Sequence, residues 1–550
     1  MGQLLPVRDV GSIGVVTDIR PASLPINAFT RAKNVRFDEG RVGRSPVFRA
    51  IKESLGFNPR LVYAIPADAS GGFAAVVLVS DTFSIKQYAN GIVSSLQGSV
   101  ATTAVNSSSI TATSLADIAY INRRDRIPVY MLNGGSSFAE LPNESATADT
   151  YSGEWDSTWR AQSIRAYGDF LLALNLTENG TNYPSRVRYS NLALANSIPD
   201  SWDASDTTKS AGFNDLVQMK TGIVDGLTLG TNFIIYAKDQ VWLMEFVGGT
   251  FIHNFRKLYS DCGVINHNCV AEVEGTHYVF DHDDIYVHDS HTRQSICDER
   301  VKSYIFNGLN TAKADRCFVH HNPDLDEVMF CYVSGDDMAE YTHGDRCNRA
   351  AVYNYKNQTW SFTDIPNVAS ATVGTVSSSA TYSNTSSVYN TIGGTYYTQE
   401  AGYDNHSLFV GESNATDGLT SDKLYGLDLS DSGTLSFPLD TEANKSPFLE
   451  RVGIDLDELS PLAGYKVINK IHPQVDTTDA NKQFTFVFGA ADLIGDATKY
   501  GAPIVFDGTT DYKIDTREAG RYLSYKMTVD DNKDFNFLGF DLDVITTGRR

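Results

Sequence analysis

The sequence predicts an all-β protein. Short alternating or fully apolar runs, bounded by Gly, Asp and Asn, recur from about residue 60 onward, and a sustained 3.6-residue apolar period is rare. Tyr and Phe, at 28 residues each, favour strands over helices. A hydrophobic content of 42% indicates a folded chain with buried cores.

A strand, an acidic turn and a second strand form the most regular unit of the chain. Residues 230–242 align with residues 275–287, because both runs begin with Gly-Thr and the offset is 45 residues. That period matches a four-stranded blade, and residues 354–360 are typical of the outer-strand turn of another blade. Since 550 residues exceed what one hydrophobic core usually organises, we expect a β-propeller of about five to seven blades.

Composition divides the chain into three predicted parts. Residues 1–55 form an N-terminal basic arm with a hairpin, residues 56–445 form the propeller, and residues 446–550 form a C-terminal β-sandwich-like domain. Two segments rich in Ser, Thr, Gly and Asn, near 97–118 and 368–398, are expected to protrude from the propeller as insertions.

The centre of the N-terminal part predicts a tight β-hairpin. Val35 and Phe37 alternate with polar residues before residues 38–40, which fit a three-residue loop with glycine at its left-handed position. We expect Asn34 and Gly40 to shape this hairpin. Its cations either discourage unwanted strand pairing at a solvated edge or contact a partner. The six cations are Arg31, Lys33, Arg36, Arg41, Arg44 and Arg49.

Charge is distributed unevenly along the chain. The net charge is −22, although residues 1–60 alone carry +5. A chain this acidic does not hold nucleic acid by neutralising its phosphates. The longest apolar run, residues 73–79, is shorter than a transmembrane helix, so no membrane insertion is expected. The N-terminus also lacks the pattern of a secretory signal, and we expect synthesis and assembly in a cytoplasm.

The sequence predicts neither a metal site, nor a cofactor, nor a catalytic residue. The six cysteines match no zinc spacing, and we expect them to be reduced and buried. Nearby histidines would form a metal site only if adjacent strands brought them together. These are His277, His282, His288 and His291. A Gly-x-Ser-x-Gly elbow and a phosphate-binding loop are both missing from the sequence, so we expect no enzymatic activity.

The two ends of the chain resemble one protein family. Residues 24–46 resemble the N-terminal region of tail nozzle, or packaged-DNA stabilisation, proteins of short-tailed bacteriophages, which then enter a β-propeller. Residues 520–526 and 538–550 resemble the closing strands of that family. The N-terminal resemblance is carried by Leu24-Pro25, Phe29, Asn34-Val35-Arg36-Phe37, Gly40, and Arg44-Ser45-Pro46.

This resemblance implies a structural protein of the virion tail. In the family, a homohexameric ring lies below the head-to-tail adaptor, retains packaged DNA and conducts it during ejection, and meets tail fibre or needle proteins. Double-stranded DNA would pass through the lumen without specific binding, helped by an acidic wall that repels phosphates. Because the axial hole of one propeller is plugged or too narrow for a duplex, the conduit would lie between subunits.

The resemblance also assigns roles to candidate residues. The six N-terminal cations would dock on an acidic ring of the adaptor or on a neighbouring subunit. Alternation in the segment 368–398 permits a long hairpin that would gate the lumen. The gate candidates are Val373, Val376, Tyr382, Val388, Tyr396 and Tyr397.

Two other classes of function fit a propeller. An adhesin or lectin would bind a cell-surface glycan, with Trp155 and Trp159 stacking on sugar rings. A glycosidase would use paired carboxylates. Otherwise these tryptophans belong to a blade core.

Overall fold

We describe a computed structural model, in which strands make up most of the described chain. The fold class is all-β, as predicted, and α1 (Lys302–Gly308) is the one α-helix among the described residues. In this part of the chain, no helix is both long and apolar enough to cross a membrane. The described residues are 3–52, 54–65, 75–89, 92–103, 110–145, 152–249, 251–335, 346–375, 405–412, 422–428, 447–456, 464–477, 482–529 and 534–547.

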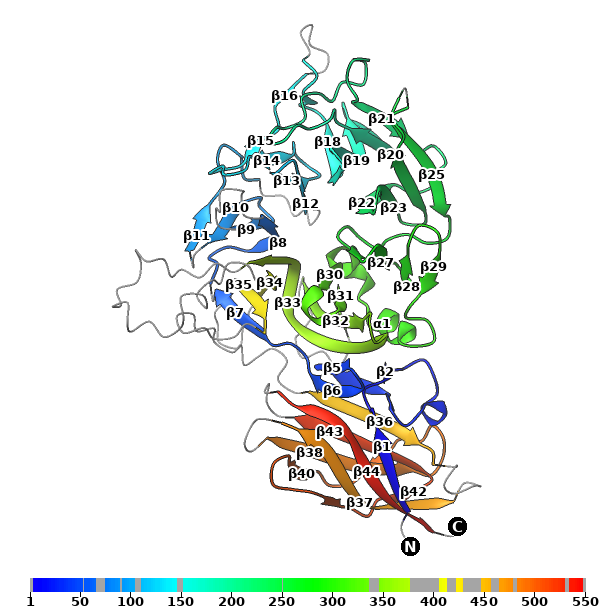
Figure 1. The fold of residues 1–550 in the computed structure, drawn as a ribbon. Helices are drawn as coiled ribbons and strands as arrows, with labels where there is room; N and C mark the ends of the chain where they lie inside the picture. The colour runs from blue at the N-terminus through cyan, green and yellow to red at the C-terminus, as the bar shows by residue number, and fades with distance from the viewer. Residues whose placement is uncertain are drawn as a thin grey trace, which may run out of the picture.

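Five four-stranded antiparallel sheets follow one another along the chain and surround a common axis as blades 1 to 5 (Figure 1). In each, the strands pair in chain order, starting from the innermost strand. Blade 1 contains β8 (Pro59–Ile65), β9 (Ala75–Ser80), β10 (Ile85–Ala89) and β11 (Ile92–Ser95). Blade 2 contains β12 (Ile110–Leu115), β13 (Ile118–Arg123), β14 (Val129–Met131) and β15 (Ala139–Glu140). Blade 3 contains β18 (Arg160–Tyr167), β19 (Phe170–Glu178), β20 (Thr181–Tyr189) and β21 (Gly212–Asp215). Blade 4 contains β22 (Ile223–Leu229), β23 (Asn232–Ala237), β24 (Val241–Phe246) and β25 (His253–Tyr259). Blade 5 contains β26 (Val270–Val273), β27 (Thr276–Phe280), β28 (Ile285–His288) and β29 (Arg293–Ser295).

Blades 6 and 7 share one long strand, β33 (Thr359–Thr375). Its first part pairs with β32 as the outer strand of blade 6, and its second part pairs with β34 as the inner strand of blade 7. The register shifts between Asp364 and Val368 on the β32 side and between Val368 and Ser370 on the β34 side, and Asn367 in this stretch adopts a φ of 45°. The other strands are β30 (Phe318–Asn322), β31 (Glu327–Tyr332), β32 (Cys347–Asn354), β34 (Asn405–Glu412), β35 (Asp422–Leu427) and β7 (Phe48–Lys52).

The N-terminal strand β7 closes the propeller, because it pairs with β35 as the outer strand of blade 7. The chain then enters β8, the inner strand of blade 1. The described strands therefore form seven blades, within the predicted range. Apolar residues pack between neighbouring blades, as Val77 and Val79 of blade 1 do against Ile121 and Val129 of blade 2.

Two sheets form the sandwich, which lies outside the ring of blades next to blade 6 and holds both chain ends (Figure 1). Rings from the two sheets meet in its core, for example Phe486 with Phe537 and Tyr525 with Phe540. One sheet contains β41 (Ile514–Asp515), β37 (Tyr465–Asp476), β44 (Asn536–Thr547), β6 (Arg41–Arg44), β5 (Val35–Asp38), β1 (Gln3–Arg8) and β42 (Ala519–Gly520). The other contains β39 (Lys499–Tyr500), β38 (Gln483–Ala491), β43 (Tyr522–Val529), β36 (Phe448–Ile454), β4 (Arg31–Lys33) and β40 (Ile504–Asp507).

Short elements complete the described structure. Strand β2 meets β33 at Gly14 and Trp360, beside the outer edge of blade 6. The remaining elements are β2 (Gly14–Val15), β3 (Ala28–Phe29), β16 (Asn143–Glu144), β17 (Trp155–Asp156), and the 3₁₀ helices η1 (Pro21–Ser23), η2 (Thr311–Arg316) and η3 (Pro323–Leu325).

The predicted N-terminal arm, residues 1–55, is not a separate unit. Strands β1, β5 and β6 pair with each other or with β44, β4 pairs with β36, and β7 belongs to the propeller. The physical reason is that β1, β4 and β6 complete their backbone hydrogen bonds with strands from the far end of the chain, and that Val35 and Phe37 are buried in a cluster that includes Leu449 and Phe537.

Two local predictions also need correction. Asp38 pairs with Arg41, so the hairpin has a two-residue loop rather than three, with φ of 46° at Glu39 and 79° at Gly40. Within the predicted insertion 97–118, residues 110–115 form the inner strand of blade 2, because Ile110 and Leu115 are buried.

Candidate functional site at the junction and on the propeller axis

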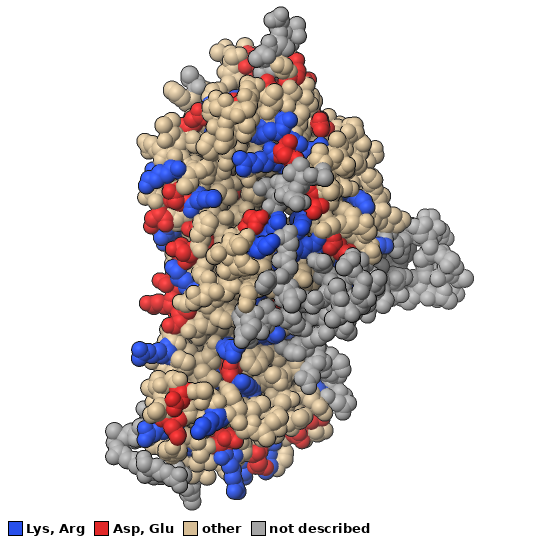
Figure 2. All heavy atoms as spheres, turned by 180° about the vertical axis from the view of Figure 1, so that it is seen from behind, with Lys and Arg blue, Asp and Glu red and all other residues tan. Residues whose placement is uncertain are grey.

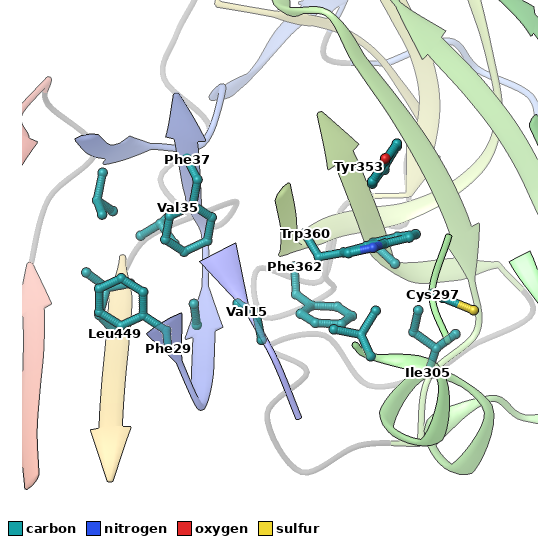
Figure 3. Packing of buried hydrophobic residues seen from close by; sticks show 14 of the residues in the cluster. Val15, Phe29, Val35, Phe37, Cys297, Ile305, Tyr353, Trp360, Phe362 and Leu449 are labelled. Atoms are coloured by element: carbon teal, nitrogen blue, oxygen red, sulfur yellow. The ribbon is translucent and has the colours of Figure 1, made fainter. Parts of the chain in front are cut away.

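The N-terminal strands lie between the propeller and the sandwich and pack against both (Figure 3). Phe29 contacts Phe37, with ring centroids 5.5 Å apart, and Tyr525 of the sandwich. On the propeller side, the same buried cluster continues through Trp360 and Phe362 of β33. The junction is therefore one continuous core rather than a flexible link.

Asn34 links the two sheets of the sandwich to the propeller. It lies between β4 and β5, is fully buried, and has a φ of 57°, a conformation that asparagine tolerates better than most residues. Its Oδ1 accepts a hydrogen bond from the Asp364 N–H at 2.9 Å, and its Nδ2 donates to Asp364 Oδ2 at 3.4 Å. Asn34 thus shapes the crossing between two sheets, beyond the hairpin role that its sequence position suggested.

Three of the predicted docking cations form ion pairs with propeller residues. Lys33 Nζ lies 3.0 Å from Asp364 Oδ2, and Arg36 Nε lies 3.2 Å from Glu327 Oε1. Arg44 Nη1 lies 2.7 Å from Asp428, which follows β35. Glu327 and Asp364 are both buried, so these pairs hold the sandwich strands on blades 6 and 7.

Of the other three cations, two pair with residues of the sandwich or of the hairpin itself, and the third lies on a propeller strand. Arg31 Nη1 is 3.5 Å from Glu450 Oε2 of the sandwich, and Arg41 Nη2 is 2.7 Å from Glu39 Oε2 of the same hairpin. Their side chains are 45% and 40% exposed, the most exposed of the five cations that form these pairs. Arg49 lies on β7, opposite Gly426.

Burial raises the pKa of Glu327 to about 7, although the neighbouring Arg36 guanidinium opposes this rise. Asp38 and Asp326 add negative charge nearby and raise the pKa further. A cavity of about 10 Å³ adjoins the Arg36–Glu327 pair. The junction therefore contains a buried acid that titrates near neutral pH.

A cavity of about 190 Å³ lies on the propeller axis and is lined by the inner strands of all seven described blades. Arg165 of blade 3 crosses to Asp225 of blade 4, with its Nε 2.8 Å from Oδ1 and its Nη2 2.5 Å from Oδ2. Arg165 also donates to Asn268 Oδ1 at 2.8 Å and to the Ala112 carbonyl at 3.0 Å. This arginine therefore ties the inner strands of blades 2, 3 and 4 to the entry of blade 5.

Asp225 is held ionised on this axis. Burial alone would raise its pKa, but Arg165 lowers the pKa to about 2. Ser163 Oγ and the Asn268 N–H also donate to its carboxylate, at 2.7 and 3.0 Å. Local sequence patterns do not reveal this pair, because its members are distant in sequence and lie on different blades.

Comparison with known proteins identifies no relative by sequence, since neither a family model nor a curated protein matches the chain. Among solved structures, the WD40 repeats of RRP9 match with a TM-score of 0.33 and 8% identity, covering 69% of this chain and 97% of that chain. U3-55K matches with a TM-score of 0.35 and 7% identity over 70% and 98%, and the AfRom2 CNH domain with 0.33 and 8% over 70% and 99%. These likenesses are too weak to carry an argument, and the propeller assignment rests on the seven sheets themselves.

Trp155 and Trp159 were considered either for glycan stacking or for a blade core, and the structure places both in the core. Trp155 is fully buried and meets Trp159 and Trp202 edge to face at 5.6 and 4.9 Å. The Arg188 guanidinium covers the Trp159 ring at 3.9 Å. Neither indole presents a free face to a sugar ring.

Two of the four candidate histidines meet in a buried chain of hydrogen bonds. His277 Nε2 donates to the Thr228 carbonyl at 2.9 Å, so its Nδ1 accepts from the Tyr236 hydroxyl at 2.7 Å. The Ser290 N–H donates to His288 Nδ1 at 3.3 Å, so His288 Nε2 donates to Tyr236 at 2.6 Å. Burial lowers the pKa of His277 to about 4 and of His288 to about 3, which keeps both rings neutral. This chain joins blades 4 and 5, and no group of metal ligands occurs among the described residues.

All six cysteines are free and buried, which confirms the prediction of reduced core cysteines. Burial raises the pKa of Cys297 and of Cys317 to about 12, so these thiols are unreactive near neutral pH.

Of the six gate candidates, Val373 lies on β33 and pairs with Ser407. The other five lie outside the described residues: Val376, Tyr382, Val388, Tyr396 and Tyr397.

Charged side chains of both signs are interspersed on the face shown in Figure 2. On this face, neither the propeller nor the sandwich presents one large patch of a single sign. The uneven charge along the sequence is thus partly evened out by folding, because the basic N-terminal strands lie against acidic partners.

Proposed function

We propose that this chain is the subunit of a tail nozzle of a short-tailed bacteriophage. In this role a homohexameric ring below the head-to-tail adaptor retains packaged DNA and conducts it during ejection. The observation that carries the proposal is the sequence of residues 24–46, which resembles the N-terminal region of that family. A β-propeller is also the fold expected from the resemblance.

The blocked propeller axis supports a conduit between subunits. A cavity of about 190 Å³, crossed by the Arg165–Asp225 pair, has room for roughly fifteen water molecules but is too small for duplex DNA. DNA would therefore run along the axis of the ring, outside each propeller. The net charge of −22 on each subunit disfavours adhesion of phosphates to the wall.

Contacts to the adaptor fall to the more exposed N-terminal cations. Lys33, Arg36 and Arg44 are used within the chain, whereas the side chains of Arg31 and Arg41 are 45% and 40% exposed. We assign adaptor docking to these last two residues. The protein would be assembled in the host cytoplasm and would end in the virion tail, where tail fibre or needle proteins are further partners.

Electron microscopy of the purified protein in negative stain tests the proposal. We expect closed rings with a central hole, and mass photometry should give a mass that is a small integral multiple of 60.3 kDa. A monomer that persists at micromolar concentration would contradict the nozzle. Binding of that monomer to a glycan array would support the adhesin instead.

A further inference from the structure

A second cavity, which we call the vestibule, adjoins the axial cavity at Asn268, Phe318 and Ser370. Its volume is about 50 Å³, and Arg60, Arg316 and Arg346 line it. The acid in its lining is Asp315, whose side chain is 52% exposed. Three arginines, from β8 of blade 1, from η2 and from the residue before β32, thus line one small space next to the axial cavity.

His267 lines the vestibule and is 8% exposed. Its Nδ1 has no hydrogen-bond partner among the described residues. Burial lowers the pKa of His267, so the ring is neutral near pH 7 and carries one N–H. A buried polar atom without a partner is costly, which indicates that something in the vestibule completes it.

The arginines around the vestibule have carboxylate neighbours at different distances. Arg346 is 3% exposed, and its Nη1 lies 2.9 Å from Asp422. Arg60 Nε lies 4.0 Å from Asp81, and Arg316 Nε lies 3.6 Å from Asp315. Arg60 and Arg316 both line the vestibule and bring positive charge to it.

We propose that the vestibule binds a small oxyanion of the size of inorganic phosphate. His267 donates from Nδ1, Arg60 and Arg316 provide the positive charge, and Arg346 forms the fixed wall. A volume of about 50 Å³ accommodates roughly four water-sized groups, as many as the oxygens of phosphate. Asp315, which also lines the vestibule and is 52% exposed, selects against larger polyanions, because they would bring further negative charge close to its carboxylate.

Isothermal titration calorimetry of the full chain with sodium phosphate tests this proposal, in a chloride buffer at constant ionic strength. We expect saturable binding to the wild type, weakened about tenfold or more in His267→Ala, because a hydrogen bond to a charged group is lost. His282→Ala is the matched control, since His282 lies in an exposed turn and should leave the affinity unchanged. Circular dichroism and the Tm without phosphate show whether each variant is folded.

A second variant and a second probe decide the remaining cases. Arg316→Gln should also weaken binding, which keeps the test valid if His267→Ala fails to fold. A short DNA duplex, added as a competitor in the phosphate titration, distinguishes a nucleic-acid phosphate from a free anion. We expect that the duplex does not compete with phosphate. The proposal would be overturned if phosphate gave no saturable heat. It would also be overturned if the wild type and both variants bound phosphate with equal affinity, because binding would then be adventitious and not at the vestibule. These results do not depend on the nozzle proposal, which the ring test addresses separately.

Discussion

Two buried arginine–carboxylate pairs in this molecule behave in opposite ways. On the propeller axis, Arg165 lowers the pKa of Asp225 to about 2 against the effect of burial. At the junction, burial raises the pKa of Glu327 to about 7 despite Arg36. The nearest nitrogen–oxygen distance is 2.5 Å on the axis and 3.2 Å at the junction, so the axial contact is the shorter one.

The two carboxylates also differ in the number of hydrogen-bond donors around them, which explains why their pKa values move in opposite directions. Asp225 accepts from two Arg165 nitrogens, from Ser163 and from the Asn268 N–H. Glu327 accepts from Arg36 Nε, while Asp38 and Asp326 disfavour its charge. A buried carboxylate keeps its charge where donors replace the lost water. The axial pair, which we call the axial lock, therefore stays charged near neutral pH, whereas the charge of the junction pair changes with pH.

Removal of residues 1–49 is expected to have the largest effect, because it destroys the junction and leaves the axial pair in place. The sandwich would lose β1, β4, β5 and β6, and blade 7 would lose the start of β7. We expect the truncated protein to be insoluble or to lack a cooperative thermal transition in calorimetry.

A shorter truncation serves as the control. Removal of residues 1–8 deletes only β1 and should leave a cooperative transition at a lower Tm. A soluble protein without residues 1–49 that keeps the wild-type Tm would show that the segment is a dispensable arm.

Asp225→Asn should strongly lower the free energy of unfolding, because it breaks the axial pair. It leaves the buried Arg165 guanidinium without a counter-charge, which costs about 3–5 kcal/mol of the free energy of unfolding. Urea unfolding followed by tryptophan fluorescence measures this loss. The double variant Arg165→Met, Asp225→Leu should recover most of it, because an apolar pair needs no charge compensation. A loss below about 1 kcal/mol in Asp225→Asn would contradict the axial lock.

Glu327→Gln should remove a pH dependence of the free energy of unfolding near neutral pH, to which the axial pair does not contribute. The folded-state pKa of about 7 lies above the ordinary value of 4.5, so the folded protein binds more protons between these values. The free energy of unfolding therefore rises as the pH falls through 7, and this gain is complete below about pH 4.5. The shift corresponds to roughly 3 kcal/mol at most.

The measurement is the difference in unfolding free energy between about pH 8 and pH 5. The wild type should gain stability relative to Glu327→Gln over this range. Glu39→Gln, which changes a 73% exposed carboxylate of the same hairpin, is the matched control and should behave as the wild type. Parallel pH profiles for all three proteins would show that Glu327 stays ionised.

Local sequence patterns predicted the hairpins and turns, whose strands are close in sequence. The repeated runs 230–242 and 275–287 correspond to the β23–β24 and β27–β28 hairpins of adjacent blades, and residues 354–360 form the turn into the outer strand of blade 6. The burial of the cysteines and of Trp155 also followed from composition and context.

Long-range pairing was not predictable in the same way. Strand β1 pairs Gln3 with Val544, and β4 pairs Lys33 with Phe448, so each partner lies hundreds of residues away. A basic segment on an acidic chain predicts docking, but its charge does not reveal that the acids it meets belong to the same chain. The axial Arg165–Asp225 pair left no local signal either, since it depends on how two blades face each other.

Arg41→Ala should have the smallest effect on stability and so separates structural cations from docking cations. The Arg41 and Glu39 side chains are 40% and 73% exposed, and such a surface pair contributes less than about 0.5 kcal/mol. The urea midpoint should therefore match that of the wild type, whereas the nozzle proposal expects co-sedimentation with a head-to-tail adaptor to fall. If adaptor binding stays intact in both Arg41→Ala and Arg31→Ala, docking lies elsewhere on the sandwich, and all the N-terminal cations that form ion pairs serve only to hold the chain together.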